Sequence, residues 1–209
     1  MRILSVETIT ADQLLSTIRQ TRLRGFGRAQ PYLDASLEVV HALDADTLAP
    51  AQNYVLTPGV AKVLDLRDAL LPEGVDIFAL NGGVYVTTSD DPGERIPVLP
   101  PIVEESREPD GRTVLLINDG MHRIFAARSL GLPISIVVAR SVPAEYPYYA
   151  FALDGGWSRV TPLAELPDGY QKKEYRQPAN YKSLFREFND LFPGVQKERK
   201  QSNPSHLAM

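Results

Sequence analysis

The chain of 209 residues contains no cysteine, one tryptophan and three histidines. The absence of cysteine excludes disulfides, thiolate metal sites and thiol nucleophiles. Three scattered histidines do not favour a dedicated zinc site. No apolar run approaches the roughly 20 residues needed to cross a membrane. The first residues also lack the apolar core and the small-residue cleavage site of a secretory signal. We therefore expect a cytoplasmic protein without a membrane partner.

Charge is unevenly distributed along the sequence. From Tyr170 to Gln201 there are eight Lys or Arg and four Asp or Glu. This local balance of +4 leaves −8 for the rest of the chain, since the whole chain carries −4. The basic segment is typical either of a solvated helical tail or of a surface that binds nucleic acid, as in a DNA-binding protein or a nuclease. The second interpretation names five candidate contacts, which are Lys172, Lys173, Arg176, Lys182 and Arg186.

Short-range patterns predict several elements. Thr10 and Gln13 form a capping-box pattern that opens a helix, and Thr57-Pro58 opens a helix that continues to about residue 71. The apolar spacing of residues 32–43 predicts a further helix. Asn81-Gly82 predicts a type I′ hairpin between strands at 75–80 and 83–88. The apolar spacing i, i+3, i+4, i+7 predicts an amphipathic helix over residues 181–192 behind Asn180.

Residues 113–138 contain the most informative pattern in the chain. They predict a strand at 113–117, a tight turn at Asp119-Gly120, a helix from Met121 to Gly131 and a strand at 134–139. Two strands joined through a helix are normally parallel, with a right-handed crossover. The domain organisation that we predict is a helical N-terminal segment (1–50), a core (51–160), and a C-terminal amphipathic helix with a basic tail (161–209).

The turn places His122 and Arg123 where the helix begins. A helix N-terminus has unpaired N–H groups and a partial positive charge, so it is suited to phosphate. Arg123 adds a planar fork of donors, and Gly120 allows close approach of the backbone to a ligand. Asp119 is a candidate base or Mg²⁺ ligand. The alternative is purely structural: Asp-Gly is a common turn, and His122 and Arg123 would then only cap and pair locally.

The motif Asp119-Gly120-Met121-His122-Arg123, followed by Ala126-Ala127, Leu130-Gly131 and an apolar strand, resembles the signature of the ParB/sulfiredoxin superfamily. The resemblance covers about residues 97–140. It implies an α+β fold in which a small mixed sheet is packed with helices and carries helical N- and C-terminal extensions. It also implies that ATP, ADP or CTP binds through its phosphates to Gly120, the backbone of Met121, His122 and Arg123.

The branches of that superfamily differ in chemistry. Sulfiredoxin chemistry needs a cysteine at the motif, whereas position 121 is Met. ParB proper has an Arg-rich motif followed by a helix-turn-helix domain, which the C-terminal third does not resemble. The motif is most similar to that of the free-serine kinase branch, which implies Mg²⁺-dependent phosphoryl transfer to a small hydroxyl-bearing acceptor, or hydrolysis of a nucleoside triphosphate. No oligomeric state is predicted.

The same resemblance assigns roles to individual acidic and basic residues. Asp119 would activate the acceptor hydroxyl or hold Mg²⁺, and His122 would act with it in catalysis while helping Arg123 to hold phosphate. These kinases also use a glutamate from elsewhere in the chain. Glu104 and its neighbour Glu105 precede the motif strand and are the candidates, and they are equally compatible with exposed loop acids.

Overall fold

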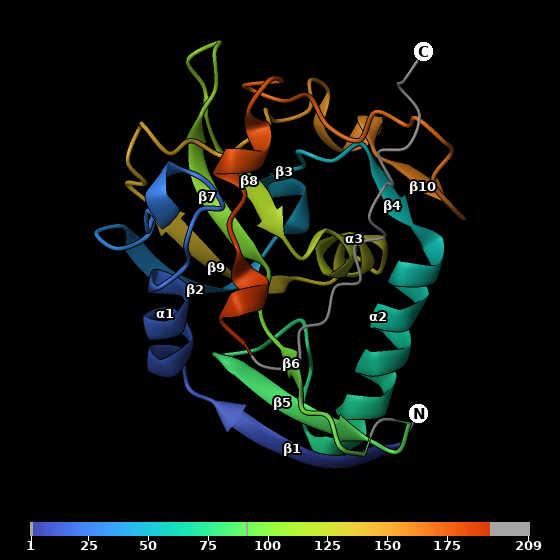
Figure 1. Ribbon diagram of the computed structural model, residues 1–209. Coiled ribbons are helices and arrows are strands. Elements are labelled where there is room, and N and C mark those ends of the chain that lie inside the picture. The colour runs from blue at the N-terminus through green and yellow to red at the C-terminus, as the bar shows by residue number, and fades with distance from the viewer. Residues whose placement is uncertain (1, 91, 193–209) are drawn as a thin grey trace, which may run out of the picture.

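The computed structural model describes residues 2–90 and 92–192, which form three β-sheets and three α-helices (Figure 1). A five-stranded mixed sheet has the order β2 (Ser36–Leu43), β9 (Ile134–Arg140), β7 (Ile102–Arg107), β8 (Thr113–Asp119), β3 (Leu48–Ala49). A three-stranded antiparallel sheet has the order β1 (Ile3–Ile9), β5 (Gly83–Thr88), β6 (Ile96–Val98). The third sheet is a parallel pair of β4 (Tyr54–Leu56) and β10 (Thr161–Leu163).

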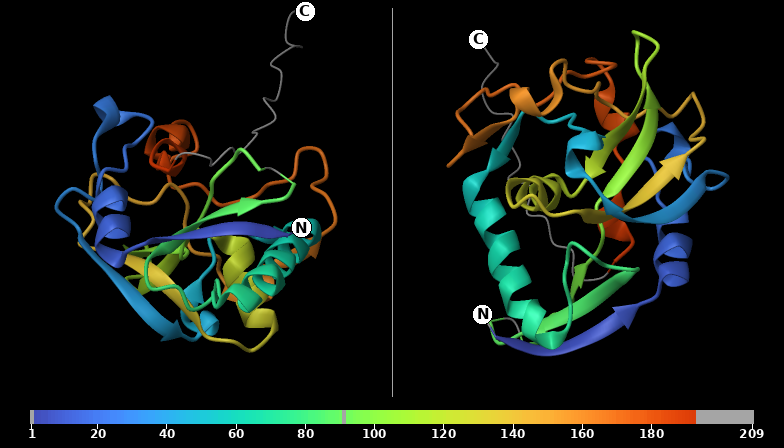
Figure 2. Two further views of the ribbon diagram at one scale, coloured as in Figure 1. Left: turned by 90° about the horizontal axis from the view of Figure 1, so that it is seen from below. Right: turned by 180° about the vertical axis from the view of Figure 1, so that it is seen from behind.

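The helices lie around these sheets. They are α1 (Ala11–Arg19), α2 (Thr57–Leu70) and α3 (Met121–Ser129). Figures 1 and 2 show α1 and α2 on opposite sides of the molecule, with the three-stranded sheet across one end. Six short 3-10 turns complete the described chain: η1 (Phe26–Arg28), η2 (Ala45–Thr47), η3 (Leu71–Glu73), η4 (Gly156–Arg159), η5 (Tyr181–Leu184) and η6 (Phe188–Asp190). This architecture confirms the predicted α+β class. Within the described ranges, no helix has the length and apolar character needed to cross a membrane.

Strand β9 is the centre of the hydrophobic core because both of its faces are buried. Ile134, Ile136 and Val138 pack in a cluster with Ile124 and Ala127 of α3. Val137 and Ala139 of β9 belong to a second cluster, with Leu14 and Ile18 of α1, on the opposite face. This alternation follows from the two-residue period of a strand. The five-stranded sheet is therefore covered by α3 on one face and by α1 on the other.

Two predicted helices are confirmed, and their boundaries follow from capping. Thr10 Oγ1 accepts a hydrogen bond from the N–H of Gln13, and Gln13 Oε1 accepts one from the N–H of Thr10, which is the reciprocal capping box of α1. Helix α2 begins one residue earlier than expected, since Leu56 is its N-cap and Thr57 its first residue. Strands β8 and β9 and helix α3 also lie where residues 113–139 predict them.

Residues 36–43 form strand β2, so the helix predicted at 32–43 is wrong. The apolar residues fit either periodicity over so short a stretch. Pairing with β9 decides the outcome, because Leu37 and Val39 then face one side of the sheet. Val40 faces the other cluster by alternation, and an irregularity between Val40 and Leu43, where Ala42 has a φ of +54°, places Leu43 on the same side as Val40. The N-terminal 50 residues therefore contribute strands β1 and β2 as well as helix α1.

The predicted hairpin at 75–88 is half wrong. Residues 83–88 form β5, but β5 pairs with β1 rather than with 75–80. Residues 75–80 are held in an irregular turn, because Asp76 accepts two hydrogen bonds from Arg67 and one from the N–H of Phe78. The Arg67 hydrogen bonds, with the smaller contribution of the Phe78 N–H, hold the pKa of Asp76 below its usual range. Gly82 is pressed against the backbone where β1 ends, and a β-carbon there would lie 2.2 Å from the carbonyl oxygen of Ile9.

The connection through α3 also differs from the expected parallel crossover. Strand β7 lies between β8 and β9, pairing antiparallel with β8 and parallel with β9. Strands β8 and β9 therefore run in opposite directions. The reason is that β7 and β8 form a hairpin, and α3 carries the chain past β7 to its other edge.

The helix predicted at 181–192 is wrong, since this segment forms η5 and η6 with extended backbone at Phe185. Its backbone bonds instead to an N-terminal loop: Arg24 N–H to the Phe185 carbonyl (2.9 Å), Gly25 N–H to that of Ser183 (2.8 Å), and Glu187 N–H to that of Arg22 (2.9 Å). We call residues 22–25 and 183–187 the terminal clasp. The apolar side chains still pack inward, as shown by buried Leu184 and Phe192. Figure 2 shows the two segments side by side.

Candidate functional site

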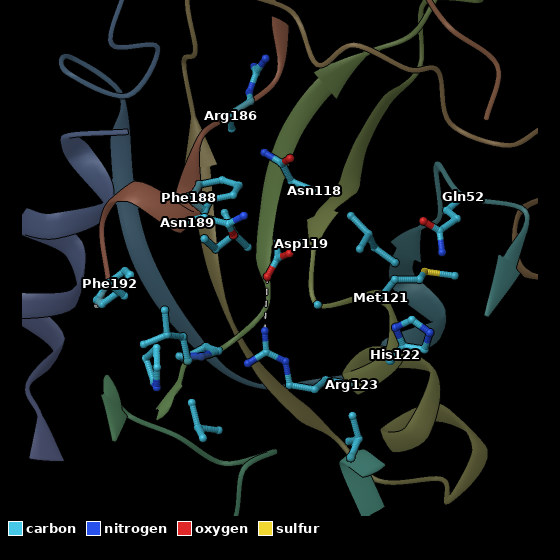
Figure 3. Close-up of a pocket in the computed structure, with 18 of the residues that line it drawn as sticks. Gln52, Asn118, Asp119, Met121, His122, Arg123, Arg186, Phe188, Asn189 and Phe192 are labelled. Carbon is cyan, nitrogen blue, oxygen red and sulfur yellow. Dashed lines mark hydrogen bonds and ion pairs between the residues drawn. The ribbon is translucent and has the colours of Figure 1, made fainter. Parts of the chain in front are cut away.

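A cavity of about 560 Å³ opens at the end of β8, where α3 begins. The motif Asp119–Arg123 forms one part of its wall (Figure 3). Helix α2 and residues 96–102 contribute apolar side chains. The C-terminal segment 185–192 forms the opposite wall. The predicted motif thus lies in a cavity of the size that proteins use for small-molecule ligands.

Glycine is required at position 120 for two reasons. Gly120 is the N-cap of α3 and has a φ of +87°, in the left-handed region. A β-carbon at this position would also lie 2.7 Å from Cβ and 2.9 Å from Cα of Pro101. The first helical bond goes from the N–H of Arg123 to the carbonyl of Gly120, so the N–H groups of Met121 and His122 precede it. The tight turn therefore presents the start of α3 to the cavity.

Arg123 supplies a cation beside this helix start. Its Nη2 atom lies 3.4 Å from Oδ2 of Asp119, a long contact for an ion pair, and the described part of the chain gives it no second ion-pair partner. Burial lowers the pKa of Arg123, and the neighbouring carboxylate opposes that shift. Because an arginine retains its proton in proteins, the guanidinium stays charged and most of its five donors remain available for an anion.

His122 lies on the wall of the cavity, but its ring is fixed by another helix. Its Nε2 atom accepts a hydrogen bond of 3.0 Å from the N–H of Leu56, the N-cap of α2. The ring also packs against Gly59, where a β-carbon would lie 2.9 Å from it. An Nε2 that accepts this bond carries no proton, which places the ring proton on Nδ1. His122 therefore holds α3 against α2, and its predicted contact with phosphate stays a prediction.

Glu104 is not an exposed loop acid. It lies on β7 with 2 % of its surface exposed, and its carboxylate binds Arg186 through two contacts of 2.8 and 2.9 Å. The hydroxyl of Tyr32 and the side-chain amide of Asn118 also donate to Oε1, each at 2.5 Å. Asn118 and Arg186 both line the cavity, whereas Glu104 lies behind them. Glu104 thus positions the cavity wall, and its predicted catalytic role stays a prediction.

The pKa values of Tyr32 and Arg186 are both raised, in agreement with a buried ion pair between Arg186 and Glu104. Burial, followed by the adjacent carboxylate, raises the pKa of Tyr32 well above its ordinary value. Burial acts to lower the pKa of Arg186, but Glu104 and Tyr32 outweigh it and the pKa is raised. Arg186 and Tyr32 are therefore held as cation and neutral phenol around the carboxylate.

The five basic residues predicted to bind nucleic acid do not form one surface. Lys172 and Lys182 are exposed. Arg176 is instead paired with buried Glu108 at 2.5 Å, and Arg186 with Glu104. The Nζ of Lys173 donates to the hydroxyl of Tyr148 at 2.8 Å and lines the cavity. Arg176 and Arg186 are thus engaged by buried carboxylates, which the charge pattern alone could not reveal.

The sequence did not predict the part of the wall formed by Gln52, Tyr54, Phe185 and Asn189. These residues come from separate segments that only the fold brings together. For the residues that the structure covers, no group of three or more His, Cys, Asp or Glu is placed to hold a metal ion.

A family model of the ParB CE domain matches residues 13–161. This chain belongs to the ParB CE domain family. The match includes the motif Asp119–Arg123 and confirms the ParB-like resemblance. The part of the chain that matches the ParB CE domain ends before Lys173 and the 185–192 wall, so both lie outside it. No match was found among curated proteins. The similarity to the free-serine kinase branch stays a prediction.

Proposed function

We propose that this ParB CE domain binds a nucleoside di- or triphosphate in the cavity, with the phosphates at the N-terminus of α3. The observation that carries the proposal is the position of Arg123: a charged fork beside that helix start, whose ion pair among the described residues is a single contact of 3.4 Å with Asp119. Backbone donors and a guanidinium at one place favour a multiply charged anion over a neutral ligand. ATP, ADP and CTP all present such a group.

We propose further that the bound nucleotide transfers a phosphoryl group, with Asp119 as the acidic residue. Asp119 is proposed as the proton acceptor; its alternative role is to hold a Mg²⁺ ion bound to the nucleotide phosphates, which usually takes one or two protein carboxylates. In the transfer, the hydroxyl oxygen of an acceptor or of water bonds to the terminal phosphorus as the bond to the leaving phosphate breaks. The hydroxyl proton passes to the carboxylate of Asp119. Positioning and charge neutralisation supply most of the rate.

The binding step is tested by Arg123→Ala. A charge-assisted hydrogen bond contributes about 1.5–3 kcal/mol, so the variant is expected to bind nucleotide roughly 10- to 150-fold more weakly. Calorimetric titration with ATP, ADP and CTP in the presence of Mg²⁺ measures this. The matched control is Arg128→Ala on the same helix, because Arg128 pairs with Asp46 away from the cavity. Equal affinities of wild type and Arg123→Ala would contradict the proposal.

The transfer step is tested by Asp119→Asn, which removes the proton acceptor and keeps the shape. We expect turnover to fall by about 10²- to 10⁴-fold, the usual contribution of general acid–base catalysis. Nucleotide affinity should change much less. Phosphate release from the bound nucleotide, and phosphorylation of small hydroxyl-bearing acceptors, are the readouts. If turnover survives the substitution, Asp119 does not have the role proposed here.

A further inference from the structure

Aromatic side chains gather at one end of the cavity. Tyr149 and Phe185 both line it, with ring centroids 4.7 Å apart and planes inclined at 63°. Tyr54, which comes from β4, lines the cavity as well. Behind this wall Tyr149 is supported by Tyr148, at 4.3 Å between centroids, and by Tyr175 at 6.3 Å. The cavity therefore has a broad aromatic surface with a rigid backing.

Lys173 adds a directed cation to the same end. Its Nζ lies 4.7 Å from the ring centroid of Tyr149 and 5.2 Å from that of Tyr148. One of its three donors is engaged by the hydroxyl of Tyr148, at 2.8 Å. An ammonium has three donors, so two remain for a ligand that lies against the rings. This end thus combines aromatic rings with a hydrogen-bond donor that lies over the ring of Tyr149.

Two arginines lie at separate places along the cavity wall. Figure 3 shows Arg186 at the top and Arg123 near the bottom, with Asn118 and Asp119 between them. Arg186 follows Phe185 in the chain, and its guanidinium lies 5.7 Å from the ring of Tyr148. Arg186 thus marks the aromatic end, as Arg123 marks the start of α3. A ligand that extends from Arg186 to Arg123 would therefore meet aromatic rings and the Lys173 ammonium at one end and the Arg123 guanidinium at the other.

We propose that the wall of Tyr149, Phe185 and Lys173 holds the base of the nucleotide. This inference rests on the proposed function, because it assigns the second half of the same ligand. A heterocyclic base offers two ring faces for stacking, and its ring nitrogens or carbonyl oxygens accept a hydrogen bond from the Lys173 ammonium. Two of the three residues lie in the segment beyond the ParB CE match. The proposed base site therefore combines Tyr149, which lies inside the match, with two residues of the C-terminal segment.

The test compares ATP and CTP with tripolyphosphate, each with Mg²⁺, by calorimetry on the full chain. Tripolyphosphate presents the charge of the nucleotide without its base. In wild type, at least one nucleotide is expected to bind tenfold or more tightly than tripolyphosphate, since stacking of a base is worth that much. Tyr149→Leu and Lys173→Met should each remove most of that advantage and leave tripolyphosphate affinity unchanged. Lys173→Met keeps the aromatic wall, so it remains informative if Tyr149→Leu fails to fold.

The matched control is Tyr181→Leu. Tyr181 stacks on Tyr175 at 3.8 Å within the same aromatic cluster but does not line the cavity. The control variant should bind like wild type. Equal affinity of wild type for tripolyphosphate and both nucleotides, or an equal loss for all three ligands in Lys173→Met, would overturn the base site while leaving the proposed function standing. No binding of any of the three would overturn both.

Discussion

Replacing Glu104 with alanine is expected to lower the free energy of unfolding by about 3–5 kcal/mol, the usual effect of removing one partner of a buried ion pair. The substitution leaves the guanidinium of Arg186 buried without its carboxylate, and it removes the acceptor of Tyr32 and Asn118. Urea unfolding followed by circular dichroism measures the change. Arg186→Ala should have a similar effect, because it leaves the carboxylate of Glu104 buried without its cation.

The next residue on β7 provides the matched control. Glu105 is exposed, and its contact with Arg140 is 3.6 Å, so Glu105→Ala should change stability by less than about 1 kcal/mol. The double variant Glu104→Leu, Arg186→Met removes both charges and should recover much of the loss, since an apolar pair of similar volume avoids the desolvation penalty. Equal effects of Glu104→Ala and Glu105→Ala would contradict the buried network described above.

Gly120→Ala is expected to lower the free energy of unfolding by about 2–5 kcal/mol and to abolish nucleotide binding. A side chain in the left-handed region costs about 1–2 kcal/mol, and forcing an extra methyl into a packed site typically costs a further 1–3 kcal/mol. The obstruction at Gly120 includes the backbone of Pro101, which cannot rotate away. The start of α3 must therefore shift, and the phosphate donors move with it. Thermal unfolding and nucleotide titration measure the two effects.

The variant Gly131→Ala distinguishes the backbone penalty of a positive φ from the steric contact with Pro101. Gly131 has a φ of +64°, but a β-carbon there would meet nothing within 4 Å. Gly131→Ala should therefore show only the conformational penalty, about 1–2 kcal/mol, with nucleotide binding retained. If the two alanine variants were equally stable and bound nucleotide equally well, the contact with Pro101 would have no part in shaping the site.

The sequence predicted the elements whose first residues carry a local signal, such as a cap or a turn. The capping box at Thr10, the Thr57-Pro58 start and the turn at Gly120 are each specified by neighbouring residues, and α1, α2 and α3 follow them. Residues 36–43 could not be assigned in this way. Their pattern fits both periods, and pairing with β9, almost one hundred positions later, decides between them. Residues 181–192 do not form the predicted helix for the same reason, since their backbone partners are in residues 22–25, far away in the sequence.

In the candidate site too, contiguous residues could be predicted from the sequence, whereas residues brought together by the fold could not. The motif Asp119–Arg123 is contiguous, so its residue types already indicate an anion site at a helix start. The network around Glu104 is not contiguous: Arg186 is 82 positions away and Tyr32 is 72. Nothing in the sequence near Arg186 distinguishes it from the exposed lysines beside it. Arg186 pairs with Glu104 only because the fold buries it against β7.

The terminal clasp affects the order in which parts of this protein can fold during synthesis on the ribosome. Arg24 and Glu187 pair across 163 positions, so the loop that they close spans most of the chain. The motif Asp119–Arg123 is synthesised well before residues 183–192, which complete the cavity wall. Domains fold as their segments emerge, so the nascent chain can form α3 and its sheet while one side of the cavity is still missing. The cavity wall is complete only when residues 185–192 have been translated.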